Sequence, residues 1–548
     1  MMNSRLYGLC LSSAVYLWSC SAVSALAEPS PTELPLYDNL GTHYFTITTS
    51  SPQAQKYFNQ GLRLTYGFNH EEAGMAYKEA ARHDPSCAMC YWGIALVLGP
   101  NINLPMDAAN EPAALEAARK AVSLSKSVTD KERALIEALA KRYGKDANQE
   151  RAARDQAYAS AMSQVAARFP DDPDIQALFA ESMMDLRPWD YWTSNGEPKP
   201  GTDQVVAALE QALKVNPNHP GACHYYIHAV EASTQPERGL DCARKLPTLM
   251  PGAGHLVHMP AHIYMRLGMY EDAIAANQTA AHVDHNYIQD RKPQGFYPMA
   301  YYPHNLHFLY AASAMAGRSN EAILAARELV EKVPPEAVSE IPPLELFTPT
   351  PYFALARFGK WEEILNESAP PVNWKYTTAI WHYARGLAYN AMNEPGSATK
   401  EKNQLRAIRL EMGEDVVIGL NQGKKLLELA DLVLSAEIAA REGHVETAKN
   451  MLNDAIQLEA TLVYDEPPAW YQPVRQVLGA IMLSAKRPAE AEKLYREDLQ
   501  RNPNNGWSLF GLVESLKAQD KITELATMEQ RFRSAWRKAD VSLSASKF

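Results

Sequence analysis

The sequence has none of the short motifs that identify common catalytic or nucleotide-binding sites. A nucleophile elbow, a His-Glu-x-x-His zinc helix, a P-loop and a dinucleotide-binding glycine motif are all absent from its 548 residues. Haem attachment is excluded as well, because Tyr91 stands where the Cys87-x-x-Cys90 motif would need histidine. Neither a nucleotide nor a haem is therefore expected as a cofactor.

Dense basic stretches are also absent. The formal net charge is −11, and the 53 lysines and arginines are scattered among 64 acidic residues. Nucleic acids and anionic membrane surfaces are bound largely through clustered lysine and arginine. Neither is therefore an expected partner.

Long hydrophobic runs are missing except at the N-terminus. There, Arg5 precedes an apolar stretch from residue 6 to about residue 23, and Ala25-Leu26-Ala27 fits the small-x-small cleavage rule. We expect residues 1–27 to be a signal peptide and the protein to be periplasmic or secreted. Trp18 stands where a lipobox needs a small residue, which argues against lipid anchoring at Cys20. No later apolar run reaches about 18 residues, so no membrane span is expected after cleavage.

Cysteine is scarce, with six in the whole chain, two of them in the predicted signal peptide. An even number in an oxidising compartment suggests pairing. Of the three possible connectivities, sequence spacing favours Cys87 with Cys90 and Cys223 with Cys242. Both bonds are expected to be structural.

Small and aromatic residues, by contrast, recur with the spacing of a helical repeat. In a frame that begins at Ala54, positions 4, 8, 20, 24, 27 and 32 are Tyr57, Gly61, Ala73, Tyr77, Ala80 and Pro85. In a frame that begins at Gln472, positions 8, 20, 24 and 32 are Gly479, Ala491, Tyr495 and Pro503. Weaker copies begin near Pro220, Gly254, Pro303 and Ala379. Small residues let two antiparallel helices approach, bulky ones fill the remaining gap, and proline ends the second helix.

This frame resembles the tetratricopeptide repeat, and the whole chain resembles a group of exported bacterial proteins built from that repeat. The resemblance implies an all-α fold, a right-handed α-solenoid of helical hairpins in which several repeats are degenerate. It also implies a concave groove that binds a protein or peptide, a role that rests on the fold alone.

Interruptions of the repeat suggest how the chain is organised. We predict a signal peptide at 1–27, an N-terminal extension at 28–50, repeats at 51–185, a loop at 186–202, histidine-rich repeats at 203–332, a proline-rich linker at 333–351, further repeats at 352–535 and a tail at 536–548. The loop at 186–202 is rich in aromatic residues, as is the stretch at 286–303. Loops of this length are functional more often than short ones.

Histidine is concentrated in one region, since nine of the 15 lie between residues 224 and 307. Seven of the nine occupy positions 2, 5 or 9 of a repeat. The tetratricopeptide resemblance directs these positions into the groove, and they share one helix face. The seven are His224, His228, His255, His258, His262, His304 and His307.

We therefore predict a transition-metal site on the concave face. Imidazole binds zinc, copper and iron well, and packed helices about 8–10 Å apart allow side chains from neighbouring helices to reach one ion. Zinc or copper is expected first, and iron is the alternative. Seven histidines with Glu231 exceed one tetrahedral shell, so the region would hold two ions, or one ion with outer partners. A hydrogen-bonded network that grips an acidic or aromatic peptide, or a pH sensor, would use the same residues.

Three functions remain open. The leading hypothesis is an exported binding or scaffold protein whose groove is shaped by the metal. The second is an enzyme, either a metal-dependent hydrolase or a copper or iron oxidoreductase, that acts on a small-molecule substrate with Glu231 as general base. The third is a metal-free scaffold that binds peptides.

Overall fold

The helical repeats expected from the sequence are present along the chain. The computed structural model describes residues 34–144, 150–293 and 295–548, and nearly all regular structure within these ranges is helical. The predicted signal peptide at 1–27, with Cys20, lies outside the described residues. In the ranges described, no helix has the length and apolar character needed to cross a membrane.

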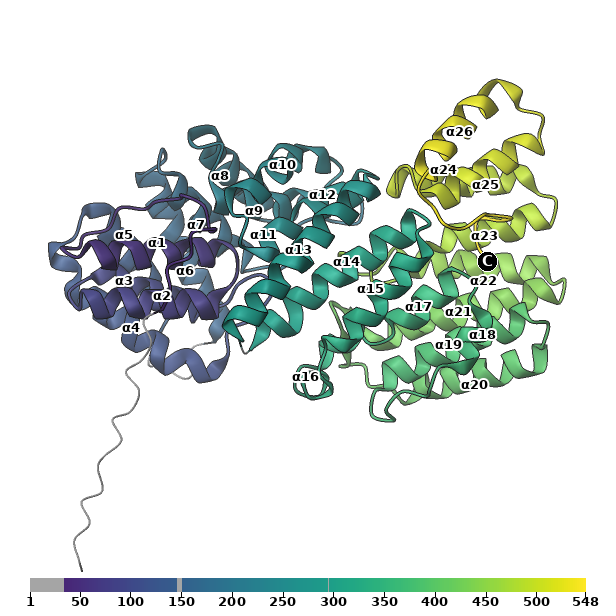
Figure 1. Ribbon diagram of the computed structural model, residues 1–548, viewed down its shortest axis with the longest axis horizontal. Coiled ribbons are helices and arrows are strands. Elements are labelled where there is room, and N and C mark those ends of the chain that lie inside the picture. The colour runs from purple at the N-terminus through teal and green to yellow at the C-terminus, as the bar shows by residue number, and fades with distance from the viewer. Residues whose placement is uncertain (1–33, 145–149, 294) are drawn as a thin grey trace, which may run out of the picture. The chain divides into compact units, whose positions relative to one another are not determined.

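The prediction of an all-α solenoid is confirmed, because antiparallel helical hairpins follow one another along Leu36–Phe548 (Figure 1). The N-terminal helices are α1 (Pro52–Tyr66), α2 (His70–His83), α3 (Ala88–Val97), η1 (Ala108–Asn110), α4 (Glu111–Leu124), η2 (Ser125–Ser127), α5 (Asp130–Leu139), α6 (Arg151–Arg168), α7 (Pro173–Met184) and α8 (Thr202–Val215). The central helices are α9 (Pro220–Val230), η3 (Pro236–Gly239), α10 (Leu240–Leu249), α11 (Gly254–His258), α12 (Pro260–Arg266), α13 (Tyr270–Arg291), η4 (Tyr297–Tyr301), α14 (Tyr302–Met315) and α15 (Ser319–Glu331).

The remaining helices complete the C-terminal part of the solenoid. They are α16 (Pro335–Glu340), η5 (Pro342–Leu346), α17 (Thr350–Arg357), α18 (Trp361–Asn366), α19 (Lys375–Ala391), α20 (Pro395–Glu411), α21 (Gly423–Arg441), α22 (Val445–Glu459), α23 (Val474–Ser484), α24 (Pro488–Arg501), α25 (Gly506–Lys517) and α26 (Ile522–Ala535). Among the described residues, the only sheet is a two-residue antiparallel pair, β1 (Val417–Ile418) with β2 (Asn421–Gln422).

The glycines and tyrosines of the repeat frame pack as their spacing predicts. A Cβ atom on Gly61 would lie 2.7 Å from Cε1 of Tyr77, and one on Gly93 would lie 2.4 Å from Cδ1 of the same ring. Near the C-terminus, Cβ atoms on Gly479 and Gly511 would lie 2.5 and 2.2 Å from Cζ of Tyr495. In both regions one tyrosine fills the space that two glycines leave between neighbouring helices.

Two predicted interruptions differ in character. The stretch at 333–351 is folded, because it contains α16 and η5, and its Val338, Leu344 and Phe347 belong to a small hydrophobic cluster. The stretch at 186–202 is a loop held by an isolated bridge between Trp192 and Pro198. It ends where α8 begins.

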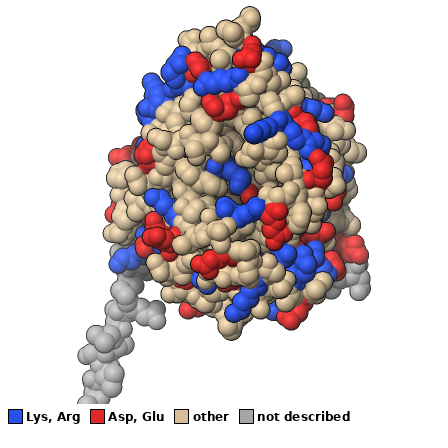
Figure 2. Space-filling view, turned by 90° about the vertical axis from the view of Figure 1, so that its right-hand side faces the viewer, with Lys and Arg blue, Asp and Glu red and all other residues tan. Residues whose placement is uncertain are grey.

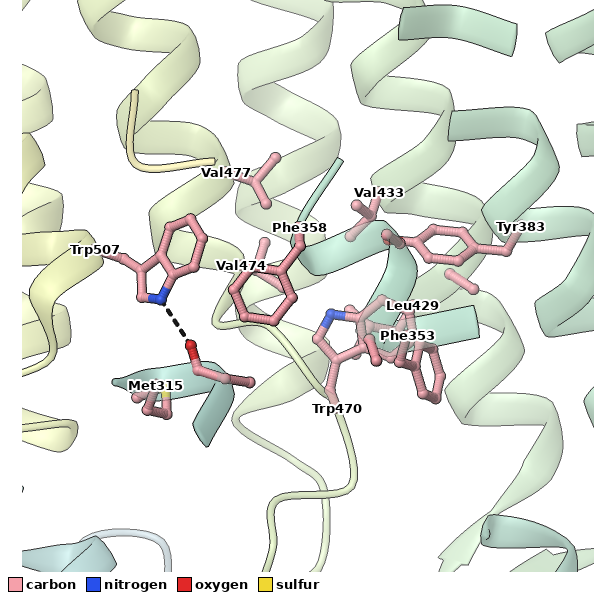
Figure 3. Close-up of a cluster of buried hydrophobic side chains, with 14 of the residues drawn as sticks. Met315, Phe353, Phe358, Tyr383, Leu429, Val433, Trp470, Val474, Val477 and Trp507 are labelled. Carbon is pink, nitrogen blue, oxygen red and sulfur yellow. Dashed lines mark hydrogen bonds between the residues drawn. The ribbon is translucent and has the colours of Figure 1, made fainter. Parts of the chain in front are cut away.

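The loop between α22 and α23 is anchored in the C-terminal core, as Figure 3 shows. Its Trp470 is 4% exposed and packs against Phe353 and Tyr383. Trp507 of α25 donates from Nε1 to the carbonyl of Ala314 in α14 over 3.0 Å, the dashed line in Figure 3. The Trp507 hydrogen bond ties the C-terminal repeats to α14.

The two predicted disulfides have different outcomes. Cys87 and Cys90 are joined, at the start of α3. Cys223 and Cys242 are instead free, buried thiols, so the second predicted bond is not formed. The frame did place them together, since the hydrogen bond between the two thiols, together with burial, raises the pKa of the Cys223 thiol.

Charged residues of both signs mix on the face drawn in Figure 2, where Lys and Arg alternate with Asp and Glu. A face of this kind offers no continuous positive surface to a polyanion. The expectation that nucleic acid is not a partner remains a prediction.

Candidate metal centre

Six of the seven predicted histidines meet in one buried cluster. His224 and His228 lie on α9, His255 and His258 on α11, His262 on α12 and His304 on α14. The rings of His224, His258 and His262 are completely buried. Ring centroids are 5.1 Å apart between His228 and His262 and 4.8 Å apart between His258 and His304. The predicted helix face therefore brings three neighbouring repeats to one point.

The local sequence places His262 on the same face as His258 although the helix is interrupted between them. Pro260 has no N–H group with which to continue the α-helical bonding, so α11 ends at His258 and α12 starts at Pro260. Met259 keeps helical backbone angles, with φ −48° and ψ −34°. The interruption therefore changes the hydrogen bonding and leaves the direction of the face unchanged.

His307 is the predicted ligand that does not join the cluster. Its ring stacks on Tyr310 and meets Phe347 edge-on, and burial lowers its pKa to about 3. Phe308 takes the inward position instead, with ring centroids 4.6 Å from both His258 and His262. At about 100° per residue, Phe308 lies closer than His307 to the direction of His304, so the assumed repeat register was wrong on this helix.

Oxygen acceptors hold the Nδ1 atoms of four of the six histidines. Nδ1 of His224 lies 2.6 Å from the carbonyl oxygen of Tyr66, and Nδ1 of His258 lies 2.7 Å from Oδ1 of Asn277. Glu231 holds the other two, with Oε1 2.8 Å from His228 and Oε2 2.6 Å from His262. Each contact places the proton on Nδ1 and leaves the Nε2 lone pair free to face the interior.

His258 and His262 form a pair that needs a cation. The orientation of Asn277 is fixed because its Nδ2 donates to the carbonyl of Ala273 over 2.7 Å, so Oδ1 must face His258. Both imidazoles then carry their proton on Nδ1, and their Nε2 atoms face each other at 2.9 Å. Two lone pairs at this distance repel unless a proton or a metal ion lies between them.

His224 and His255 form a second pair, in which one ring can donate a hydrogen bond to the other. Their Nε2 atoms are 3.1 Å apart, but among the described residues Nδ1 of His255 has no hydrogen-bond partner. His255 is therefore free to carry its proton on Nε2 and donate it to His224. Nε2 of His228, beside this pair, is buried and likewise has no partner in the described part of the chain.

The electrostatics of the cluster favour a metal ion over protons. Burial, reinforced by the neighbouring histidines, lowers the pKa of His224, His255, His258 and His304 well below the usual value for histidine. Burial alone would raise the pKa of Glu231, but its charge interactions and hydrogen bonds with His262 and His228 hold it at about 2. Near neutral pH these four imidazoles are thus uncharged, and they lie near the buried carboxylate of Glu231.

The same contacts argue against the predicted role of Glu231 as general base. Both carboxylate oxygens are occupied by histidine, and the Tyr464 hydroxyl lies 3.3 Å from Oε2. A carboxylate with a pKa of about 2 is also a weak proton acceptor. Glu231 instead fixes the orientation of two imidazoles, the part that outer carboxylates play in many metal sites.

Aromatic side chains cover the cluster. Phe68 stacks on His228 and His255, Tyr301 lies 4.6 Å from His255 between ring centroids, and Trp189 lies 5.1 Å from His228. Trp189 donates from Nε1 to Oδ1 of Asn103 over 3.0 Å, and Nδ2 of Asn103 donates to the Tyr301 hydroxyl over 3.2 Å. Both aromatic stretches singled out in the sequence, the loop at 186–202 and the largely helical 286–303, therefore contribute side chains that lie over the histidines.

Other neighbours of the cluster carried no signal in the sequence. Phe68 and Tyr464 lie at positions that the repeat frame does not mark, and Asn277 stands at position 24 of the repeat that begins at Gly254, where Tyr77 and Tyr495 stand in the clearer repeats. Phe68 and Trp189 have positive φ values of 56° and 63°, an uncommon backbone conformation for a bulky side chain. Only the folded chain brings these residues to the histidines.

A second group of potential ligands is satisfied without a metal. Oδ1 of Asp174 accepts hydrogen bonds from His43, His219 and the Tyr66 hydroxyl, at 2.8, 3.1 and 2.7 Å. Nδ1 of His219 already accepts from the backbone N–H of Ala222. No lone pair of His219 remains for an ion, so this group acts as a structural anchor for α9.

Comparison with known proteins adds little beyond the fold. No family model matches the chain, and no curated protein matches it. A solved structure of a human IFIT1 dimer with m7Gppp-AAAA is 15% identical, with a TM-score of 0.33 over 90% of this chain and 92% of that one. Yeast Tom70 is 13% identical, with a TM-score of 0.28 over 88% and 90%. Likenesses this weak support no argument about function, which must come from the site.

Proposed function

We propose that this tetratricopeptide-like solenoid binds a transition-metal ion through inward-facing histidines, and that His258, His262 and His304 form the principal site. One ligand nitrogen from each of these residues lies within 4.8 Å of the others. The observation that carries the proposal is the His258–His262 pair, whose Nε2 lone pairs face each other at 2.9 Å while both Nδ1 atoms are bound to oxygen.

The donor set suits zinc, copper or iron. All the nitrogens are imidazole nitrogens, which these ions bind well. Two nitrogens 2.9 Å apart, each about 2.0–2.1 Å from a common ion, would subtend about 90° at that ion. This angle is typical of a tetragonal ion such as Cu(II), and a tetrahedral ion such as zinc would require the pair to open by a few tenths of an ångström.

The metal would hold together three repeats that contribute to one groove, so the leading role is that of an exported binding or scaffold protein.

Export from the cytoplasm rests on residues 1–27. It would be tested by sequencing the N-terminus of protein recovered from the periplasm or medium. A mature chain that begins at Glu28 is expected, and an intact Met1 would contradict export.

A metal-dependent activity on a small molecule is the second candidate. The principal site has three histidine ligands, while Glu231 is engaged with Nδ1 atoms. Three protein ligands leave a coordination position for water or a substrate, as catalytic sites do. In that case an ion would supply Lewis acidity or redox chemistry, and Asn277 and Glu231 would orient its ligands.

The test is whether metal stabilises the fold through these residues. Metal-free protein would be titrated with Zn²⁺ or Cu²⁺ while thermal unfolding is followed by circular dichroism. Binding to the folded state at about 100 times Kd adds about 2.7 kcal/mol of stability, so the Tm should rise. The variant His258→Ala/His262→Ala should show a clearly smaller rise, because the principal site is lost.

A matched control is available on α13. His282 and His285 are both exposed and lie outside the cluster, so His282→Ala/His285→Ala should respond to metal as the natural chain does. An equal rise in Tm in all three proteins would mean that the metal binds elsewhere.

A further inference from the structure

We propose that His224, His228 and His255 form a second, weaker transition-metal site beside the principal one, which makes the cluster a two-ion centre. This inference rests on the proposed function. One ligand nitrogen from each of the three residues lies within 4.8 Å of the others, and all three residues are buried.

Nε2 of His228 has no other occupation, because it is buried and lacks a hydrogen-bond partner among the described residues. A buried polar atom without a partner is costly, so a native site normally supplies one. The Nδ1–H of His228 is held by Glu231, which leaves its Nε2 as a lone pair with no protein donor.

The second site adjoins the first through a shared carboxylate. Glu231 holds His228 through Oε1 and His262 through Oε2, so a single residue orients one ligand of each group. Ring centroids of the two groups are 5.1 Å apart between His228 and His262, and 5.8 Å apart between His255 and His258. Ions in both groups would therefore be near neighbours.

Two features make the second site the weaker one. Without an ion, the His224–His255 contact is a stable hydrogen bond, and an ion bound between their Nε2 atoms would have to replace it. No oxygen holds Nδ1 of His255, so this ring is less well oriented than those of His258 and His262. A second cation would also meet the charge of the first.

The order in which the two sites bind metal can be tested directly. Metal-free protein would be titrated with Cu²⁺ alone, with stoichiometry from elemental analysis after buffer exchange and affinity from chelator competition. The natural chain should bind two ions whose Kd values differ by at least about tenfold. In His228→Ala/His255→Ala the tight ion should remain and the weak one should be lost, and His282→Ala/His285→Ala should bind both.

Electron paramagnetic resonance supplies a readout that does not depend on activity. Two Cu(II) ions this close should couple magnetically, so the resonance of isolated Cu(II) should weaken as the second equivalent binds. The single variant His255→Gln, which changes the core least, should restore the isolated signal at two added equivalents. Circular dichroism would establish that each variant is folded.

Each outcome decides the proposal. One ion in the natural chain, unaffected by His228→Ala/His255→Ala, would overturn the second site and leave the principal one intact. Loss of the tight ion in that variant would overturn the proposed order. Failure of the natural chain to bind any ion would overturn the proposed function itself.

Discussion

The two halves of the histidine cluster each consist of three histidines, yet they differ in whether a close pair of rings requires a cation. Each half contains two Nε2 atoms close together, at 2.9 Å for His258 and His262 and at 3.1 Å for His224 and His255. In the first pair both Nδ1 atoms are bound to oxygen, and in the second only that of His224 is. The outer hydrogen bonds therefore decide whether a pair of imidazoles must have a cation or merely accommodates one.

Glu231 is the residue that the two halves share, so its replacement should have the largest effect. Glu231→Gln offers one oxygen and one NH₂ group where two oxygens are needed, and it removes the buried negative charge. Loss of an outer partner typically lowers metal affinity about 10–100-fold, and we expect a reduction of that size for both ions. Chelator competition measures it. A loss confined to one ion would show that Glu231 does not link the halves.

Asn277 belongs to one half only. Asn277→Leu removes the acceptor of His258 and frees this ring to move its proton to Nε2. We expect about a tenfold loss of affinity at the principal site and little change at the second, so the two Kd values should converge in the same titration. Equal weakening of both ions would contradict the separation of the halves.

Asp284 supports α11, the helix that carries His255, and its titration should make the stability of the protein depend on pH. Asp284 is fully buried and accepts hydrogen bonds from Asn305 and from Tyr297, whose hydroxyl oxygen accepts from the His255 backbone N–H. Burial raises the pKa of Asp284 to about 7. A raised carboxyl pKa means that the folded state holds its proton more tightly than the unfolded state does. The contribution of Asp284 to stability should thus be greatest below about pH 4 and fall as the pH rises towards 7, by at most about 4 kcal/mol.

Asp284→Asn removes this titration, so the natural chain should lose stability relative to the variant as the pH rises from about 4 to 7. Urea unfolding of the metal-free proteins at several pH values measures the difference. Parallel curves for the two proteins would refute the assignment of this pH dependence to Asp284.

Trp189 lies over the cluster without contributing a ligand, so its replacement should change affinity least. Trp189→Ala opens the cover over His228 and removes the hydrogen bond to Asn103. We expect nearly unchanged Kd values and faster removal of metal by a chelator, followed in a stopped-flow experiment. Trp189→Phe keeps most of the cover and serves as the control. Equal rates in all three proteins would mean that metal leaves by another route.

Sequence reasoning predicted the fold class and all six clustered histidines, because both follow from helix periodicity. The frame that placed Tyr77 and Tyr495 between glycines also placed His224, His228, His258 and His262 on inward faces. It failed at His307, where a small error in register exchanged histidine for Phe308.

Several groups that hydrogen-bond to the cluster could not be predicted, because they come from distant parts of the chain. Tyr464 lies 233 positions beyond Glu231 and reaches it only because the α22–α23 loop is anchored by Trp470 in the C-terminal core. The carbonyl of Tyr66 is a backbone group 158 positions from His224, and no sequence motif marks it. The sequence also could not separate the two possible roles of Glu231, because a general base and an orienting carboxylate are the same kind of residue.

The most direct test of the central claim is elemental analysis, by plasma mass spectrometry, of protein exported to an oxidising compartment and purified without a nickel column or a chelator. The account predicts at least one equivalent of zinc, copper or iron, which falls by about one equivalent in His258→Ala/His262→Ala and persists in His282→Ala/His285→Ala. No metal above trace in the natural chain, together with no binding of added Zn²⁺ or Cu²⁺, would contradict it.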